Sequence, residues 1–246
     1  RHRVIAVLTF NDGVLFRTKL FEPDYRYTHN FVDAWSIDEI IALDITRQDK
    51  GSRENFETVI RDFAKNCFVP LTVGGKIRTL DDVKKMFDHG ADKITINTGA
   101  LEQPELISEI ASKYGTQCVV LSIDAKINEH GNYEVFSNSG SQATGRHPAE
   151  WAVEGEKRGA GEILLTSIER DGSLQGYDID LCISVTSSVR LPVLILGGCG
   201  TWANMLEGIR VANASAACTQ NIYHFTETSI QSAKQFLNKK GIPVRL

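Results

Sequence analysis

Short runs of apolar, often β-branched residues recur along the chain, separated by longer stretches in which apolar residues return at helical spacing. Runs of this length are typical of strands buried on both faces, as in a parallel sheet. The predicted strands are 4–9, 40–45, 70–75, 93–98, 118–124, 163–168, 192–197 and 216–222. Several runs have a charge before them and a polar residue after them, so the two ends of the sheet should differ in chemistry.

Amphipathic stretches between most of these runs predict helices. Apolar residues in 53–66 recur every three or four positions, and Thr79 is a suitable N-cap for a helix over 79–89. Gly115, Gly159 and Gly241 are suitable C-terminal stops. The remaining predicted helices are 102–114, 148–159, 178–189, 201–213 and 226–240.

The alternation of strands and helices predicts an α/β protein with a parallel sheet. Eight such units predict a closed (βα)8 barrel, with an open doubly wound sheet as the alternative. Because barrels of about 250 residues form single domains, residues 1–246 are predicted to be one domain.

A weak internal repeat predicts two half-barrels of four units each. The segments 70–75 and 192–198 both begin with Pro and end in Gly-Gly, and Thr9 and Asp124 both end apolar runs. The longest irregular stretches, 11–30 and 126–147, follow the first strand of each half. Both are expected to be loops over the same rim of the barrel.

Composition excludes several classes of function. The 246 residues carry 27 basic and 31 acidic side chains, with a net charge of −4 and no basic block, which argues against nucleic-acid or membrane binding. The five cysteines form no CxxC pair, so reduced, mostly buried thiols are expected rather than a zinc site. No metal or other cofactor is predicted. The chain shows no membrane span or signal peptide, which favours a cytoplasmic protein.

Candidate chemistry lies where the strands end, because barrel active sites form at the carboxyl ends of the strands. Asp124 is the best acid/base candidate, although an ion pair with Lys126 would also explain it. The polar residues predicted at this rim are Thr9, Asp44, Asn97, Asp124, Thr166, Ser167 and Asp171.

Glycine-rich turns accompany these polar residues at Gly74–Gly75, Thr98–Gly99, Gly172 and Gly197–Gly198. Backbone amides in such turns bind phosphate well when a helix begins beside them. Two turns in opposite halves would suit a substrate with two anionic ends. Tight turns and close packing explain the same glycines equally well.

Four segments carry a resemblance to a known family over nearly the whole chain. They are 43–46, 90–97, 122–126 and 156–172. Their residues resemble the cyclase subunit of imidazole glycerol phosphate synthase. The resemblance implies a (βα)8 barrel that receives ammonia from a glutaminase subunit and adds it to a bis-phosphorylated substrate at the rim.

Several functional positions depart from this family. Of its two catalytic aspartates, one matches Asp124 and the other falls on Thr9, whose hydroxyl cannot act as a carboxylate base. Phosphate-site positions fall on Lys76 in place of glycine, on Leu196 in place of serine, and on Gln220 and Asn221 in place of small residues. Positions that do match are Asn97, Asp171, Gly172 and Gly198.

The opposite end of the barrel keeps the family pattern. Four charged residues each precede an apolar run, namely Arg3, Glu39, Lys93 and Glu162. They match the family's ring of charges at the entry for ammonia. A purely structural ring of salt bridges is the alternative.

The chain also resembles a subgroup of cyclase-like paralogues found with sugar amidotransferases, through segment 21–27, which is a shorter and less specific match than the family match. This implies a synthase-type subunit that passes ammonia from a glutaminase partner towards amidino-sugar formation. An ATP-dependent sugar amidotransferase would be a third partner, and the acceptor would be phosphorylated or nucleotide-linked. The alternatives are a genuine cyclase of histidine biosynthesis and a non-catalytic scaffold that activates a glutaminase.

Overall fold

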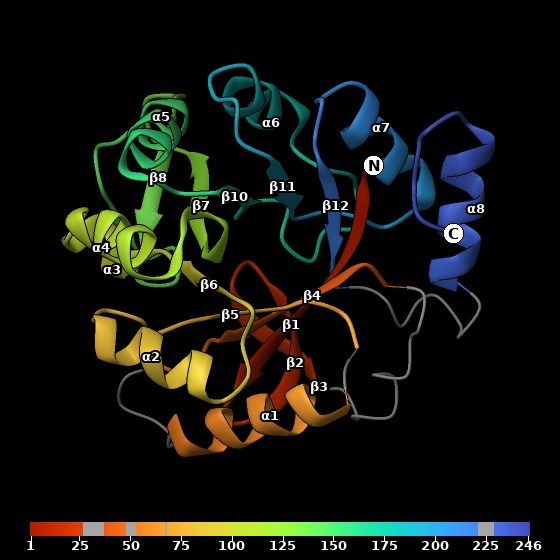
Figure 1. Ribbon diagram of the computed structural model, residues 1–246. Helices are drawn as coiled ribbons and strands as arrows, with labels where there is room; N and C mark the ends of the chain where they lie inside the picture. The colour runs from red at the N-terminus through yellow and green to blue at the C-terminus, as the bar shows by residue number, and fades with distance from the viewer. Residues whose placement is uncertain (27–36, 48–52, 67, 221–228) are drawn as a thin grey trace.

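The computed structural model in Figure 1 describes residues 1–26, 37–47, 53–66, 68–220 and 229–246. Eight parallel strands form a closed barrel. In spatial order they are β1 (Arg3–Asn11), β4 (Glu39–Asp44), β5 (Leu71–Gly74), β6 (Lys93–Ile96), β7 (Val119–Ile127), β10 (Glu162–Ser167), β11 (Val193–Leu196) and β12 (Ala216–Thr219). Strand β12 pairs with β1 and closes the ring, which confirms the barrel and excludes the open sheet.

Helices form the outer layer of the barrel in Figure 1. They are α1 (Arg53–Asn66), α2 (Leu80–Asp88), α3 (Thr98–Glu102), α4 (Glu105–Tyr114), α5 (Pro148–Arg158), α6 (Ile179–Thr186), α7 (Trp202–Arg210) and α8 (Ser229–Lys239). Thr79 caps α2 as predicted, and Gly159 ends α5 in the left-handed conformation at φ 102°. The helix predicted over 102–114 instead begins at Glu105 after Pro104, and α3 precedes it.

The described parts of the two stretches predicted as irregular, 11–26 and 126–147, are largely β-hairpins, so the prediction of irregular structure was wrong there; residues 27–30 lie outside the described residues. Strand β1 continues into antiparallel β2 (Val14–Lys19) and β3 (Glu22–Arg26), and β7 continues into β8 (Tyr133–Ser137) and β9 (Gln142–Ala143). Asp12 and Gly13 have φ of 51° and 73°, so they form the two-residue turn that suits a twisted hairpin.

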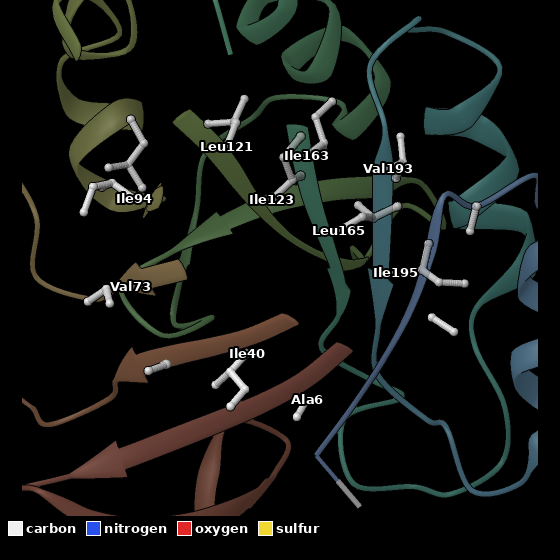
Figure 2. Close-up of a cluster of buried hydrophobic side chains, with 14 of the residues drawn as sticks. Ala6, Ile40, Val73, Ile94, Leu121, Ile123, Ile163, Leu165, Val193 and Ile195 are labelled. Carbon is white, nitrogen blue, oxygen red and sulfur yellow. The ribbon is translucent and has the colours of Figure 1, made fainter. Parts of the chain in front are cut away.

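The strand wall is buried on both faces. Side chains that point outward pack against the helices, and Figure 2 labels several of them, from Ala6 on β1 to Ile195 on β11. The inward side chains form a second apolar cluster that fills the lumen of the barrel: Ile5, Val7, Ile41, Val120, Leu164, Leu194, Leu196, Ala216 and Cys218. The alternation follows from the two-residue period of a strand and explains the uninterrupted apolar runs.

The two halves of the barrel share local structural features, which agrees with the predicted half-barrel repeat. The first strand of each half, β1 and β7, has nine residues and continues into a hairpin. Helices α2 and α7 begin with matching capping boxes, Thr79 with Asp82 and Thr201 with Asn204. Each box follows the Gly-Gly turn of its half.

Three of the four cysteines that the structure describes, Cys182, Cys199 and Cys218, are buried, and Cys118 is partly exposed. All four are free thiols, and burial raises the pKa of Cys199 to about 11, so this thiol is protonated at neutral pH. Cys67 lies outside the described residues. Among the described helices, none has both the length and the apolar character that a membrane span requires.

Candidate functional site

Asp124 lies at the centre of a polar cluster at the carboxyl ends of β6, β7 and β10. Its strand alternates so that Val120 and Asp124 share the inward face. The Asn97 side-chain amide donates a hydrogen bond to the Asp124 carboxylate at 2.5 Å, and Thr166 stands opposite Asp124 in the parallel register. Three predicted rim residues therefore lie together.

The environment of Asp124 suits acid/base chemistry. Although part of the residue reaches solvent, its carboxyl group is enclosed by protein, and this burial raises its pKa to about 7. The negative charge of Asp171 adds to the shift, while hydrogen bonds from Asn97, Thr166 and Ser122 oppose it. A group with this pKa can both accept and donate a proton near neutral pH.

The alternative interpretation of Asp124, an ion pair with Lys126, does not agree with the position of the Lys126 side chain. The Lys126 ammonium lies over the Phe136 ring, 4.3 Å from its centroid. The Asn97 amide occupies the hydrogen-bonding position beside the Asp124 carboxylate instead. Its other end, the Asn97 Oδ1 oxygen, is buried and has no hydrogen-bond partner within the described part of the chain.

Thr9 stands across the barrel from Asp124, since β1 and β7 are four strands apart in the ring. Its hydroxyl donates a 2.5 Å hydrogen bond to the carbonyl of Phe16 in the neighbouring strand β2. The side chain is 97% buried, and its single proton is committed to the hairpin. Thr9 therefore supplies no second acid/base group at the rim.

A second polar cluster joins the β2–β3 hairpin to the C-terminal half of the barrel. The Thr18 hydroxyl is 3.1 Å from both the Asp171 carboxylate and Gln220 Oε1. Gln220 Oε1 also accepts from the Thr18 amide at 3.1 Å, and Asp171 accepts from the Phe21 amide at 2.9 Å. Gly172 allows this approach, because a Cβ there would lie 2.7 Å from the Thr18 carbonyl. Sequence reasoning missed Thr18 and Phe21.

The Gly-Gly turns serve close packing. Gly75 and Gly197 have φ of 95° and 103°, and a Cβ on either would collide with the backbone of the neighbouring strand. The helices that follow satisfy their own first amides through the capping boxes: Asp82 accepts from Arg78 and Thr79, and Asn204 accepts from Gly200 and Thr201. Close packing thus accounts for these glycines, and the use of the turns and helix N-termini for phosphate stays a prediction.

The remaining predicted rim residues have other local roles. Lys76 adopts φ 56° where glycine would be unstrained, and Arg53 donates to its carbonyl. Thr98 accepts a hydrogen bond from the Asn138 amide of the second hairpin. Asp44 points outward from the barrel, as Ile40 and Ala42 of the same strand do. One of its carboxylate oxygens accepts a hydrogen bond from the Thr46 amide. Gly198 packs against the Gly176 carbonyl. Asn221 lies outside the described residues.

At the opposite end of the barrel, four charged side chains close into a ring. Arg3 donates to Glu39 at 2.8 Å and to Glu162 at 2.7 Å. Lys93 lies 3.1 Å from Glu39 and 2.9 Å from Glu162. Each carboxylate thus bridges both cations, and the Thr72 hydroxyl also donates to Glu39 at 2.7 Å.

The ring is charge-balanced and largely withdrawn from water. Glu39 is the most enclosed member, with 2% of its side chain exposed. Burial acts to lower the pKa of Arg3, but the charges of Glu162 and Glu39 outweigh it and raise that pKa. Because both cations are paired with both carboxylates, the ring closes this end of the lumen in the conformation observed.

Comparison with known protein families gives one match. The family model described as "Histidine biosynthesis protein" matches residues 6–229. The chain belongs to this family. Its members are generally enzymes built on the (βα)8 barrel, which agrees with the closed barrel and with the polar cluster around Asp124. The matched range includes Glu39, Lys93 and Glu162 of the ring, and Arg3 lies just before it.

Within the described residues, no group of three or more His, Cys, Asp or Glu side chains is placed to hold a metal ion. The polar groups at the rim include amides, hydroxyls and the carboxylates of Asp44, Asp124 and Asp171. Such groups transfer protons and orient an acceptor.

Proposed function

We propose that the protein is the synthase-type subunit of a glutamine-dependent complex, which receives ammonia at the ring and delivers it to an acceptor at the rim. The observation that carries this proposal is the sealed, charge-balanced ring beneath an apolar lumen, with an acid/base carboxyl at the far end. A ring built only for stability would not need a lumen that ends beside such a group.

The lumen suits neutral ammonia better than ammonium. Nine inward side chains between the two ends are apolar or a protonated thiol, and moving a charge through such surroundings is strongly unfavourable. Ammonia would enter when one of the cations, Arg3 or Lys93, leaves its carboxylate partners. Entry would then be controlled by a docked glutaminase, which is the partner we propose for this end.

At the rim, Asp124 would accept the proton that ammonia loses when its nitrogen bonds to the acceptor carbon. Asn97 would hold the carboxylate in place through the 2.5 Å hydrogen bond. Because Thr9 is committed to the hairpin, only one acid/base group acts, where the cyclase reaction uses two. We therefore propose another acceptor: an amide of a phosphorylated or nucleotide-linked sugar. An ATP-dependent amidotransferase partner would transfer a phosphate or adenylate group to the amide oxygen, and ammonia would displace that oxygen with its activating group to form an amidine.

The proposal is tested by supplying [amide-15N]glutamine to the purified complex together with nucleotide-linked acetamido sugars and ATP. We expect 15N in a sugar amidine. Replacing Asp124 with Asn should abolish the product while leaving glutamine hydrolysis intact. If no sugar yields an amidine under these conditions, the proposed acceptor class is wrong.

A genuine cyclase of histidine biosynthesis is the second candidate, favoured by the family match and by the raised pKa of Asp124. The purified protein alone, given ammonium salts and the bis-phosphorylated pathway substrate, decides between the two. Turnover would assign the cyclase function and reject the sugar acceptor. A passive scaffold would require that Asp124→Asn has no effect on any reaction of the complex.

A further inference from the structure

A buried lysine joins the last helix to the edge of the sheet that carries the ring. The Lys234 ammonium of α8 lies 2.6 Å from Asp38 Oδ1, and only 3% of the Lys234 side chain is exposed. Lysine is rarely buried to this extent unless it is paired. Asp38 stands directly before β4, and 7% of its side chain is exposed. The pair therefore lies inside the protein, one residue from Glu39 of the ring.

Asp38 also holds the start of β1. Its Oδ2 oxygen accepts a hydrogen bond from the Val4 amide at 2.8 Å, and its own amide donates to the Val4 carbonyl at 3.1 Å. The parallel pairing of β1 with β4 begins at Ile5 and Glu39, so Val4 lies before it. Because Val4 is fully buried, its amide needs an acceptor, and the Asp38 side chain provides one.

These contacts bear on one side of the ring. Arg3 precedes Val4 and Glu39 follows Asp38, so the contact between Val4 and Asp38 joins the two backbones directly beside these ring members. Of the four pairs in the ring, Arg3–Glu39 is the one whose members lie on neighbouring strands. Its 2.8 Å contact therefore depends on how β1 and β4 are placed relative to each other.

Stability alone is the simpler explanation of a buried ion pair, but two charges are a poor choice for it. Their removal from water offsets much of their attraction, and an apolar pair of similar volume is often as stable or more so. The charges do provide direction. Asp38 turns one oxygen towards Lys234 on α8 and the other towards Val4 on β1, which an apolar side chain could not do.

We infer that Lys234 and Asp38 are positioning residues for the ring, which hold Arg3 and Glu39 in register and couple α8 to the closed end of the lumen. The inference rests on the proposed function and deepens it, because it gives the entry for ammonia a support outside the lumen. Lys234 acts on the ring through Asp38. When the pair is broken, the starts of β1 and β4 lose their common anchor and the contact between Arg3 and Glu39 loosens.

The test uses the isolated chain labelled with 15N and follows hydrogen exchange of the Arg3 guanidinium protons, which donate to Glu39 and Glu162. Lys234→Met keeps an unbranched side chain and removes the charge. We expect exchange at Arg3 to become roughly tenfold faster, as for the loss of a hydrogen bond to a charged group. Asp38→Asn offers one oxygen to two donors and should give a smaller acceleration, so it serves if Lys234→Met does not fold.

The matched control is Lys84→Met, the same change in an exposed lysine paired with Asp88 on α2, which should leave exchange at Arg3 unaltered. Ile110→Ala, a core truncation in α4, lowers stability without touching the pair and so separates loss of stability from loss of position. Unchanged exchange at Arg3 in Lys234→Met and Asp38→Asn, or an equal acceleration in Ile110→Ala, would overturn the inference.

The complex gives a second readout. With [amide-15N]glutamine and excess unlabelled ammonium, Lys234→Met should lower the 15N content of the aminated product, whereas Lys84→Met should not. The guanidinium measurement needs neither ammonia nor a partner, so it can fail while the proposed function stands. Faster exchange at Arg3 in a complex that delivers no ammonia would keep the positioning role and reject the proposed function.

Discussion

The two ends of this barrel both place polar groups at the edge of an apolar core, but the polar groups are paired at one end and partly unpaired at the other. At the ring, two carboxylates and two cations pair in a closed circuit, and every member has a charged partner. At the rim, Asn97 Oδ1 and Ser167 Oγ are buried without partners in the described residues, and Thr18 serves two acceptors with one proton. Satisfied groups seal the barrel, whereas unsatisfied ones leave capacity for a ligand.

The paired charges of the ring could be present only to stabilise the fold, whereas the unpaired polar atoms of the rim could not. Buried polar atoms without partners cost free energy, on the order of 1–3 kcal/mol each. A protein retains such atoms where a substrate, product or water completes them. Four predictions test the comparison, in order of expected effect.

The largest effect should come from breaking the ring at its most enclosed member. Glu39→Ala leaves Arg3 and Lys93 with one carboxylate between them and should destabilise the protein by about 3–5 kcal/mol, because unpaired buried charge is costly. Urea unfolding measures the change. Glu102→Ala, which removes an exposed partner of Arg78, should cost less than about 1 kcal/mol. Equal losses in both variants would show that the ring is not a closed circuit.

The next effect concerns the charge of Asp124. Because its pKa is raised to about 7 in the folded protein, its stabilising contribution is complete below the unfolded pKa and is lost as pH rises through 7. Asp124→Asn should therefore be more stable than the wild type above neutral pH, by roughly 2–4 kcal/mol, and similar to it only below about pH 4, where the carboxyl is protonated in both states. Denaturation at several pH values checks this. A difference that does not vary with pH would contradict the raised pKa.

A smaller effect is expected where the hairpin meets the rim. Thr18→Val removes the hydroxyl that faces Asp171 but keeps the shape and the backbone contact with Gln220. Hydrogen bonds to charged groups contribute about 1.5–3 kcal/mol, so amide exchange at Leu20 and Phe21 should accelerate roughly 10- to 100-fold. Thr58→Val, which removes an exposed hydroxyl on α1, is the control. Unchanged exchange at Phe21 would mean that Asp171 does not hold the hairpin.

The smallest effect is a change in titration. Asn97→Ala removes the hydrogen bond that favours the Asp124 carboxylate and should raise the pKa of Asp124 further. Carbon-13 detection of the carboxyl group during a pH titration measures this directly. A lower pKa in the variant would show that Asn97 does not stabilise the charged form.

Much of the fold was predictable because its signals are local. Each barrel strand contains an apolar run, and the four charged residues that precede such runs fall on the ring because parallel strands begin at the same edge. The hairpin after β1 also had a local signal, since Asp12–Gly13 between two apolar runs is a typical hairpin turn, but the stretch was taken as irregular. Pro104 likewise explains why the helix predicted from 102 starts later.

The candidate site was predictable only in part. Asp124 and Asn97 end their strands and were found, whereas the contact between Thr18 and Gln220 joins residues 202 positions apart. Nothing in either local sequence indicates that contact, because it depends on where the hairpin lies over the closed barrel. The direction of the Asp44 side chain likewise depends on which alternate residues of its strand point into the barrel.

The central claim is that ammonia travels inside the barrel from the ring to the rim. It is tested most directly by giving the purified complex [amide-15N]glutamine in the presence of excess unlabelled ammonium and measuring the 15N content of the aminated product. The account predicts a product that stays almost fully labelled, since ammonia in the lumen does not mix with bulk solvent. A product whose nitrogen matches the bulk ammonium would show that the lumen does not carry it.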